Sequence, residues 1–450
     1  MKHILLSALI LLTSLQAWAL PQANKDGSET TPKVVLSIND EDGVYAIGDK
    51  VTVWAEAAED VVLKVELLDN GVTSVQSKEI KVRPGKKSVL YSKKHNEAAH
   101  MMLKVSYEGL EKPDMAGFIV APETYTTGYD MPADFKEFWD KQKQAMRDVK
   151  QEVSLTPVSI SDLPGSNGFV CYDLRISMHQ GRPVRGYIVM PENAAPGSLP
   201  IVIKVHSAGV NKHFNYARPQ DALSYAKYGK GCISIDINAH GIETGQPQEY
   251  YDDLYHGELQ NYSSRKITGH DEYYFRLMFL RLVRTLDYAC SRSEWDGKRA
   301  LIVGESQGGA QAMALAGLDS RISACVATVP AMNDLGASKD GRPACWPKAR
   351  DSKLNKGQEI TDQVLPYYDV ALHARFSKAA FWIEVGLADG TCPAPAVWSG
   401  VNGISGECNV HAYPFRTHYK PNKPYEAEWR KNIYEKRFEW MKKHLGEENL

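Results

Sequence analysis

Hydrophobic and polar residues follow two different patterns along this chain, and the change of pattern divides it into two parts. Apolar and polar residues alternate in short runs at 34–38, 50–55, 63–67 and 102–107, with turn-forming pairs such as Asp42-Gly43 and Asn70-Gly71 between runs. Short alternating strands with regular turns predict a small immunoglobulin-like β-sandwich domain over residues 33–120. No catalytic constellation is evident there, so we interpret it as a structural or interaction module.

Beyond Pro200 the apolar runs become continuous and alternate with helical patterns. The strand-like runs are 201–205, 232–237, 301–303, 324–329 and 381–385, and the helical ones are 221–228, 272–291, 307–317 and 426–444. This order predicts an α/β fold with a mostly parallel sheet covered on both faces. A linker over 121–130, a helix from Pro132 to about Lys150 and a hairpin of 169–176 with 184–190 precede it.

The segment 300–316 predicts a strand, a sharp turn and a helix, with a serine at the tip of the turn. The turn reads Gly304-Glu305-Ser306-Gln307-Gly308. Glycines flank the serine where bulkier residues would clash, as in the nucleophile turn of hydrolases. The serine hydroxyl would stand clear of the sheet, and the backbone N–H of Gln307 would lie beside it at a helix N-terminus. We therefore predict that Ser306 is a nucleophile and that Gln307 donates to an oxyanion.

A serine nucleophile needs a base and a carboxylate, which follow it in the order acid, histidine. Four histidines follow Ser306: His373, His411, His418 and His444. His418 comes just after the strand pattern of 409–413, where a loop can present it to the serine. His444 belongs to the terminal helix and His411 to the strand itself. We predict that His418 is the base.

The acid is expected just beyond the preceding strand. Asp389 is the first carboxylate after the run 381–385, whereas Asp362 and Asp369 occupy a segment without strand character. We predict Asp389 as the acid. The loop 206–210 has small residues that let its backbone approach a substrate, so the N–H of Ala208 is the predicted second oxyanion donor. No metal-ligand spacing, phosphate loop or dinucleotide motif occurs, so neither a metal nor a cofactor is predicted.

Composition places this chemistry in an ordinary globular protein. The 450 residues are 43% hydrophobic and 24% charged with a net charge of −2, which gives no field for nucleic acid or an anionic membrane. A basic residue, a short apolar run and Ala17-Trp18-Ala19 predict a signal peptide over 1–19, cut after Ala19, and a secreted or periplasmic protein. A polar leader over 20–32 would follow. Seven cysteines leave at least one unpaired, and Cys392 and Cys408 are candidates for a pair.

Several motifs together resemble one known family. They are Gly304-Glu305-Ser306-Gln307-Gly308-Gly309, Gly386-Leu387-Ala388-Asp389 with Cys392-Pro393, Tyr273-Tyr274-Phe275-Arg276, and the helix opening Pro132 to Trp139. The region from about Tyr129 to the C-terminus, 129–450, resembles the acetyl xylan esterase/cephalosporin C deacetylase family of α/β-hydrolases. The resemblance implies an α/β-hydrolase fold and a serine esterase that removes acetyl groups from carbohydrate esters such as acetylated xylan or xylo-oligosaccharides.

The sequence departs from the family pattern at two sites, a three-residue segment and a single residue. Asn238-Ala239-His240 stands where the family usually has Arg-Gly-Gln, and Tyr419 follows His418 where glutamate is usual. Three alternatives stay open from the residues alone. They are an esterase for larger acyl groups, a serine peptidase on the same fold, and a non-catalytic carbohydrate-binding protein. The sequence does not decide between a monomer and a homo-oligomer.

Overall fold

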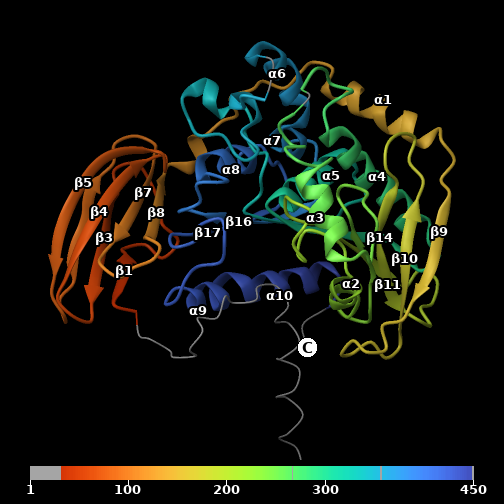
Figure 1. Ribbon diagram of the computed structural model, residues 1–450, viewed down its shortest axis with the longest axis horizontal. Helices are drawn as coiled ribbons and strands as arrows, with labels where there is room; N and C mark the ends of the chain where they lie inside the picture. Colours follow the sequence, from red (N-terminus) through yellow and green to blue (C-terminus); the bar gives the residue numbers. More distant parts are fainter. Residues whose placement is uncertain (1–31, 266, 355–356, 448–450) are drawn as a thin grey trace, which may run out of the picture.

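Two parts of the chain are visible in the computed structural model, which describes residues 32–265, 267–354 and 357–447 (Figure 1). The first is an all-β part that ends near Val120, and the second is a larger α/β part. The predicted signal peptide, residues 1–19, and nearly all of the predicted leader lie outside the described residues.

The all-β part consists of two antiparallel-rich sheets. Its strands, within the described residues, are β1 Val34–Ile38, β2 Val44–Tyr45, β3 Lys50–Ala57, β4 Val61–Asp69, β5 Thr73–Val82, β6 Ser88–Lys94, β7 Ala99–Ser106 and β8 Asp114–Val120. One sheet has the order β1-β3-β6 and the other β2-β8-β7-β4-β5. Buried apolar residues of both sheets, among them Val53 of β3 and Leu103 of β7, share one cluster. The two sheets therefore pack as layers, and we call this part the sandwich.

The α/β part is built on one nine-stranded sheet. Its strands are β9 Val153–Val158, β10 Phe169–Ile176, β11 Val184–Pro191, β12 Leu199–Lys204, β13 Ile233–Ile237, β14 Trp295–Glu305, β15 Ala324–Thr328, β16 Ala380–Gly386 and β17 Cys408–Tyr413. The order is β17-β16-β15-β14-β12-β13-β11-β10-β9. Strands β12 to β17 pair in parallel, and β9 to β11 add an antiparallel edge. The predicted mostly parallel sheet is confirmed.

Helices cover both faces of this sheet (Figure 1). They are α1 Phe135–Arg147, α2 Pro219–Ala226, α3 Gln248–His256, α4 Phe275–Ser291, α5 Gln307–Leu318, α6 Gln358–Val364, α7 Val370–Ala374, α8 Ala394–Val401, α9 Glu426–Trp429 and α10 Glu435–His444. Successive residues of β14 alternate between the two faces: Ile302 joins the core under α4 and α5, and Leu301 joins the core over α10. No helix within the described ranges is both long and apolar enough to cross a membrane.

Sequence patterns located most of these elements and missed a few. The predicted helix 426–444 is interrupted by a π-helical turn, Arg430–Tyr434, between α9 and α10. The sequence did not predict α3, α6, α7 or α8, which are short and lie in long connections. It also did not predict β9, an edge strand whose residues are mostly exposed and so carry no continuous apolar run.

The two parts share a buried core. The cluster that fills the sandwich continues into Trp382 and Tyr413 of the central sheet and into Trp429 and Trp440 of the C-terminal helices. The hydroxyl of Tyr425 also accepts a hydrogen bond of 2.7 Å from the backbone N–H of Leu36 in β1. The sandwich is therefore packed against the α/β part by apolar burial as well as by hydrogen bonds.

The pairing considered for Cys392 and Cys408 is wrong, because both thiols are free. Cys408 lies opposite Phe381, at the start of β16, whereas Cys392 follows the end of that strand. At about 3.3 Å per residue the length of β16 puts roughly 20 Å between the two cysteines, and a disulfide needs Cα atoms within about 7 Å.

Candidate active site

The predicted nucleophile occupies a strained turn between β14 and α5. Ser306 has φ 57° and ψ −119°, and its N–H donates to the carbonyl of Thr328 at 2.9 Å. A non-glycine residue at positive φ is costly, so the surrounding packing must hold it there. A Cβ at Gly304 would lie 2.3 Å from the backbone of Gly308, and one at Gly308 would lie 2.8 Å from the carbonyl of Val205. This is the crowding that the sequence predicted.

The predicted base reaches the serine from the segment after β17. Nε2 of His418 lies 2.9 Å from Oγ of Ser306. Its other ring nitrogen, Nδ1, lies 2.8 Å from Oδ2 of Asp389. A carboxylate only accepts, so Nδ1–H donates to Asp389 and Nε2 is left to accept the serine proton. The three residues come from three separate loops at the carboxyl ends of β14, β16 and β17.

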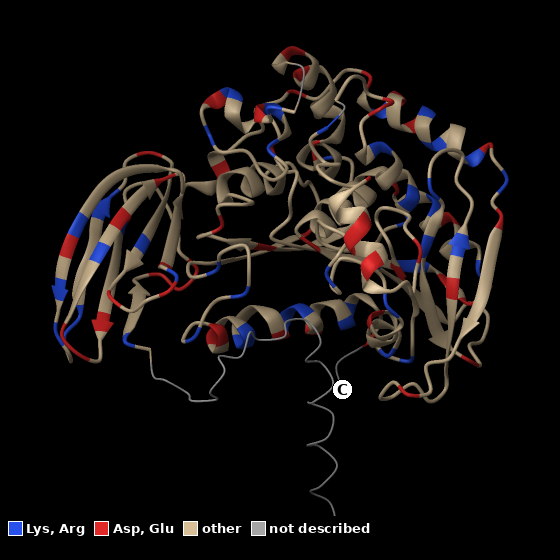
Figure 2. Cartoon of the chain, viewed as in Figure 1, with Lys and Arg blue, Asp and Glu red and all other residues tan. Residues whose placement is uncertain are grey.

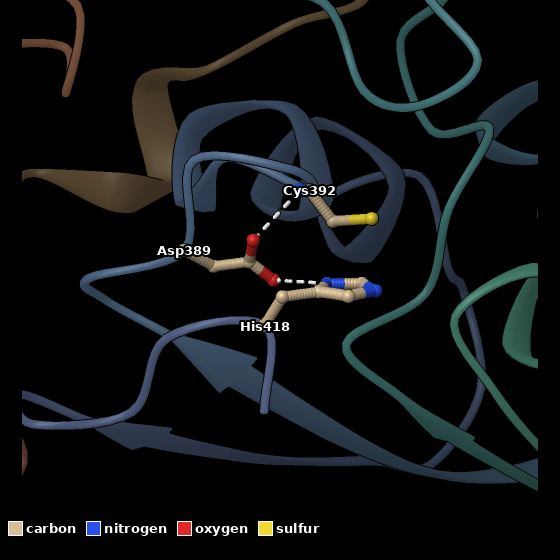
Figure 3. Close-up of side chains that lie close together, drawn as sticks. All are labelled: Asp389, Cys392 and His418. Carbon is tan, nitrogen blue, oxygen red and sulfur yellow. Dashed lines mark hydrogen bonds and ion pairs between the residues drawn. The ribbon is translucent and has the colours of Figure 1, made fainter. Parts of the chain in front are cut away.

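The predicted acid is fully buried and firmly held (Figure 3). The second carboxylate oxygen of Asp389, Oδ1, accepts the backbone N–H groups of Thr391 at 2.7 Å and Cys392 at 2.9 Å. Two oxygens with three donors leave the carboxylate fixed in position, with Oδ2 directed at His418. The structure therefore brings Ser306, His418 and Asp389 into one hydrogen-bonded chain.

The other candidate acids and bases lie elsewhere. The side chain of Asp362 pairs with Arg350. Asp369 begins α7 and accepts the N–H of Ala371, and burial raises the pKa of its carboxyl to about 8. The remaining histidines have packing contacts: His373 with the carbonyl of Tyr367, His411 stacked on Trp382, and His444 against Trp440.

One group of side chains has the composition of a metal site. Ligand-type atoms of Asp389, Cys392 and His418 lie within 4.8 Å of one another. Figure 3 shows the three side chains grouped together. Burial raises the pKa of the Cys392 thiol well above its ordinary value, so the sulfur is a poor thiolate ligand. The carboxylate is already occupied by its N–H donors. This donor set fits an orienting carboxylate and histidine better than a metal centre.

Gln307 directly follows Ser306, and the loop of Ala208 contacts the same turn, because the hydroxyl of Ser207 donates to the carbonyl of Glu305 at 3.2 Å. Gln307 opens α5, and the loop of Ala208 follows β12, the strand next to β14. Within the described part of the chain, no acceptor is hydrogen-bonded to the N–H of either residue. A backbone donor at the N-terminus of α5 and a second one in the loop after β12, both without protein partners, can receive a developing negative charge.

A buried polar network holds the loop of Ala208 in place. His206 lies at its start, and its ring nitrogens contact Oδ1 of Asp236 at 2.5 Å and the carbonyl of Phe214 at 3.0 Å. The side chain of Asn215 donates to the carbonyl of Ala208 at 2.8 Å. Such a network fixes the loop backbone so that its N–H direction is set before a ligand arrives.

A buried ionic cluster lies next to the segment that carries His418, and the sequence patterns did not reveal it. Glu384 of β16 accepts from Arg416, and also from Nη1 of Arg437 at 3.0 Å. Burial alone would raise the pKa of this carboxyl, but Arg437 and Arg416 outweigh it and lower the pKa. Arg416 is two residues before His418, so the cluster fixes the segment that carries the predicted base. The sequence signal that could have indicated this cluster is Glu384, a charged residue inside the apolar run 381–385.

The two departures from the family pattern have different surroundings. Asn238 connects loops, because Oδ1 accepts the N–H of Ala217 at 2.6 Å and Nδ2 donates to the carbonyl of Ile242 at 2.7 Å. His240 is buried and bonds the hydroxyl of Tyr274 at 2.7 Å. Tyr419 is 75% exposed, and its ring lies edge-on to that of His418 with centroids 5.8 Å apart.

Most aromatic residues of the insertion at 250–262 are packed rather than exposed. Tyr251 stacks on Tyr216 with centroids 4.1 Å apart, and the buried hydroxyl of Tyr262 donates to the side chain of Gln307. Tyr255 of α3 is the aromatic residue of this insertion with a largely exposed ring, at 45%. The packing interpretation of the insertion thus fits Tyr251 and Tyr262.

Comparisons with known proteins place these features in a family. A family model described as acetyl xylan esterase (AXE1) matches residues 120–436. The match starts where the sandwich ends, and it includes Ser306, Asp389, His418, Gln307 and Ala208.

Individual relatives agree with this match. The chain is 29% identical over 305 residues to the acetyl esterase Axe7A of Xylanibacter ruminicola, and the aligned region covers 66% of each chain. The structure of an acetyl xylan esterase from Paenibacillus sp. R4 is 26% identical with a TM-score of 0.56, and it covers 70% of this chain and 98% of its own. Acetyl xylan esterase 1 from a Thermoanaerobacterium species has the same fold, at 22% identity and a TM-score of 0.57, and covers 72% of this chain and 97% of its own.

Proposed function

The chain belongs to the acetyl xylan esterase family, and from this premise we propose that it is a secreted serine esterase that removes acetyl groups from carbohydrate esters through an acyl-enzyme. The family's members are carboxylic ester hydrolases. The single observation that supports the mechanism most strongly is the continuous hydrogen-bonded chain from Oγ of Ser306 through His418 to Asp389.

Acylation follows from this geometry. Ser306 Oγ attacks the acetyl carbonyl carbon while Nε2 of His418 takes the hydroxyl proton. Asp389 holds the ring in the tautomer that has a proton on Nδ1, and it stabilises the imidazolium. The N–H groups of Gln307 and Ala208 bind the oxyanion, and each contributes roughly 3 kcal/mol to transition-state stabilisation. When the tetrahedral intermediate collapses, the imidazolium protonates the leaving sugar oxygen and acetyl-Ser306 remains.

Deacylation repeats these steps with water. His418 removes a proton from a water molecule that attacks the acetyl carbonyl, and the same two N–H groups bind the second oxyanion. Collapse of that intermediate releases acetate and returns the proton to Ser306. No step requires a metal or a cofactor.

Acetylated carbohydrate is the proposed substrate because of the family and because of the name of a relative. The family description is acetyl xylan esterase, and the relative from Xylanibacter ruminicola is called an acetyl esterase. Acetylated xylan or xylo-oligosaccharides are therefore the first substrates to test.

The test is a substrate panel on the purified enzyme. Acetate release from acetylated xylan is measured together with kcat/KM for acetyl, butyryl and octanoyl esters of one nitrophenol and for an aminoacyl anilide. We expect acetate release and a preference for the acetyl ester. An open apolar pocket would instead favour each added methylene by roughly 1 kcal/mol. Activity that rises with chain length would identify a general esterase, and anilide cleavage a peptidase.

Export is tested separately, by sequencing the N-terminus of the mature protein. The proposal predicts that it begins at Leu20, after removal of residues 1–19. A mature protein that still begins at Met1 would contradict it.

A further inference from the structure

The sandwich contacts the α/β part next to the loop that carries Asp389. His100 of β7 is fully buried, and its Nε2 lies 2.9 Å from the carbonyl oxygen of Leu387. A carbonyl only accepts, so Nε2 carries the proton and donates. Burial lowers the pKa of this imidazole to about 4, and the ring is neutral near pH 7. Nδ1 finds no hydrogen-bond partner in the described part of the chain, so the bond to Leu387 is the ring's polar contact.

A second contact brings the two backbones together. The N–H of Gly117 in β8 donates to the carbonyl of Pro414 at 2.8 Å. A Cβ at Gly117 would lie 1.9 Å from the carbonyl oxygen of Leu387, so only glycine fits. A Cβ at Gly43 would likewise lie 2.6 Å from the Leu387 side chain and 2.9 Å from that of Pro414.

The two anchor points lie on the segments that carry the acid and the base. Leu387 is two residues before Asp389, and Pro414 is four residues before His418. These segments are also bonded to each other, because the N–H of Leu387 donates to the carbonyl of Tyr413 at 3.1 Å and the N–H of Ala388 donates to that of Arg416 at 3.0 Å. Figure 1 shows β17 on the side of the sheet next to the sandwich.

We propose that the sandwich positions the acid and the base of the active site, with His100 as a positioning residue that holds the carbonyl of Leu387. This inference rests on the proposed roles of Asp389 and His418. Most of the sandwich, including His100 and Gly117, lies before the region that matches the family model, so this contact joins that region to a part of the chain outside it. Productive geometry tolerates about 0.5 Å of displacement, and a misplacement of 1 Å can cost about 100-fold in rate.

The test compares replacements at His100 in the full-length protein. His100→Leu fills the space but has no donor, whereas His100→Gln places an N–H near the position of Nε2. His95→Leu is the matched control, because His95 is also buried in the sandwich and its Nε2 bonds the hydroxyl of Tyr91 at 2.7 Å, within the sandwich itself. The measurements are kcat and KM for 4-nitrophenyl acetate, per folded molecule, and the midpoint of thermal unfolding.

We expect His100→Leu to lower kcat on the order of tenfold with KM nearly unchanged, since the acid and the base shift while the acyl site stays intact. His100→Gln should recover most of that loss. His95→Leu should keep its kcat even where its thermal midpoint falls as far as that of His100→Leu. Equal kcat in all three variants, or a kcat that follows thermal stability alone, would overturn the proposal.

A second variant keeps the proposal testable if His100→Leu does not fold. Gly117→Ala leaves every sandwich side chain in place and pushes against the carbonyl of Leu387. Gly269→Ala is its control, because a Cβ there meets nothing within 4 Å. A lower kcat in Gly117→Ala alone supports the proposal, and an unchanged kcat in a folded Gly117→Ala contradicts it. Inactivity of Ser306→Ala in the same assay tests the proposed function separately.

Discussion

The proposed nucleophile and the proposed acid–base pair of this site are held in two different ways. Ser306 lies in a turn whose shape is encoded by a short motif, and that turn packs closely on the neighbouring strands through Gly304 and Gly308. Asp389 and His418 lie on loops that depend on distant parts of the chain, including the buried Glu384 cluster and His100 of the sandwich. The first arrangement can be read from a continuous motif, whereas the second depends on contacts with residues far away in the sequence.

This difference has a consequence for mutation. Removal of the Ser306 hydroxyl should act mainly on chemistry, since it leaves the backbone of the turn and its packing in place. A change in the contacts that hold the segments of Asp389 and His418 should affect both catalysis and the packing of the sandwich against the α/β part. Figure 2 shows acidic and basic residues intermixed on the sandwich strands and on the outer helices. We therefore attribute the packing of the two parts to short-range contacts rather than to attraction between oppositely charged surfaces.

The largest effect is expected for Ser306→Ala. Removal of the nucleophile should lower kcat about 10⁴- to 10⁶-fold, because the remaining groups bind the ester but cannot form the acyl-enzyme. The thermal midpoint should stay within a few degrees of wild type. The check is acetate release by rigorously pure protein together with thermal unfolding. Activity above a few per cent of wild type would remove Ser306 from its role.

Asp389→Asn should have the next largest effect. An amide can donate toward Nδ1 of His418, which favours the wrong tautomer, and kcat should fall about 10³- to 10⁴-fold. Asp362→Asn is the matched control, since Asp362 pairs with Arg350 away from the site. The check is kcat for an acetyl ester in both variants. Equal activity of the two would show that another carboxylate orients the base.

The sequence predicted the locally encoded features well. The turn around Ser306 is a continuous motif, and Asp389 and His418 could be chosen because each follows a recognisable strand. It did not reveal the role of His100 or Gly117, because nothing in an alternating β-strand shows which residue faces a distant loop. It also suggested a pairing of Cys392 with Cys408, because separation along the chain does not reveal that the two cysteines lie near opposite ends of β16.

A smaller effect is expected on stability at acid pH. The pKa of His100 is about 4 in the folded chain against an ordinary 6.5, so the unfolded state binds more protons between these values. Stability therefore falls as pH drops from about 6.5 towards 4, and His100 accounts for up to about 3 kcal/mol of that fall. His100→Gln should lose less free energy of unfolding than wild type when urea denaturation at pH 7 is repeated at pH 4.5. Parallel losses in both proteins would contradict this assignment.

The smallest effect is expected for the exposed side chain of Tyr419 beside His418. Tyr419→Ala should lower kcat/KM for acetylated xylo-oligosaccharides by roughly five- to tenfold, because an exposed ring beside His418 can stack on a sugar. The rate with 4-nitrophenyl acetate should change less than about twofold. Tyr255→Ala, which removes another exposed ring, serves as the comparison. Equal losses on both substrates would mean that Tyr419 acts through His418 rather than on the sugar.

The most direct test of the central claim is to locate the nucleophile by covalent labelling. The full-length enzyme is treated with a fluorophosphonate ester, which reacts with serines activated by a neighbouring base, and the labelled peptides are identified by mass spectrometry. The proposed mechanism predicts one adduct, on Ser306, with loss of activity in proportion to labelling. It also predicts much slower labelling in His418→Ala. Labelling of another residue, or full inactivation with Ser306 unmodified, would contradict it.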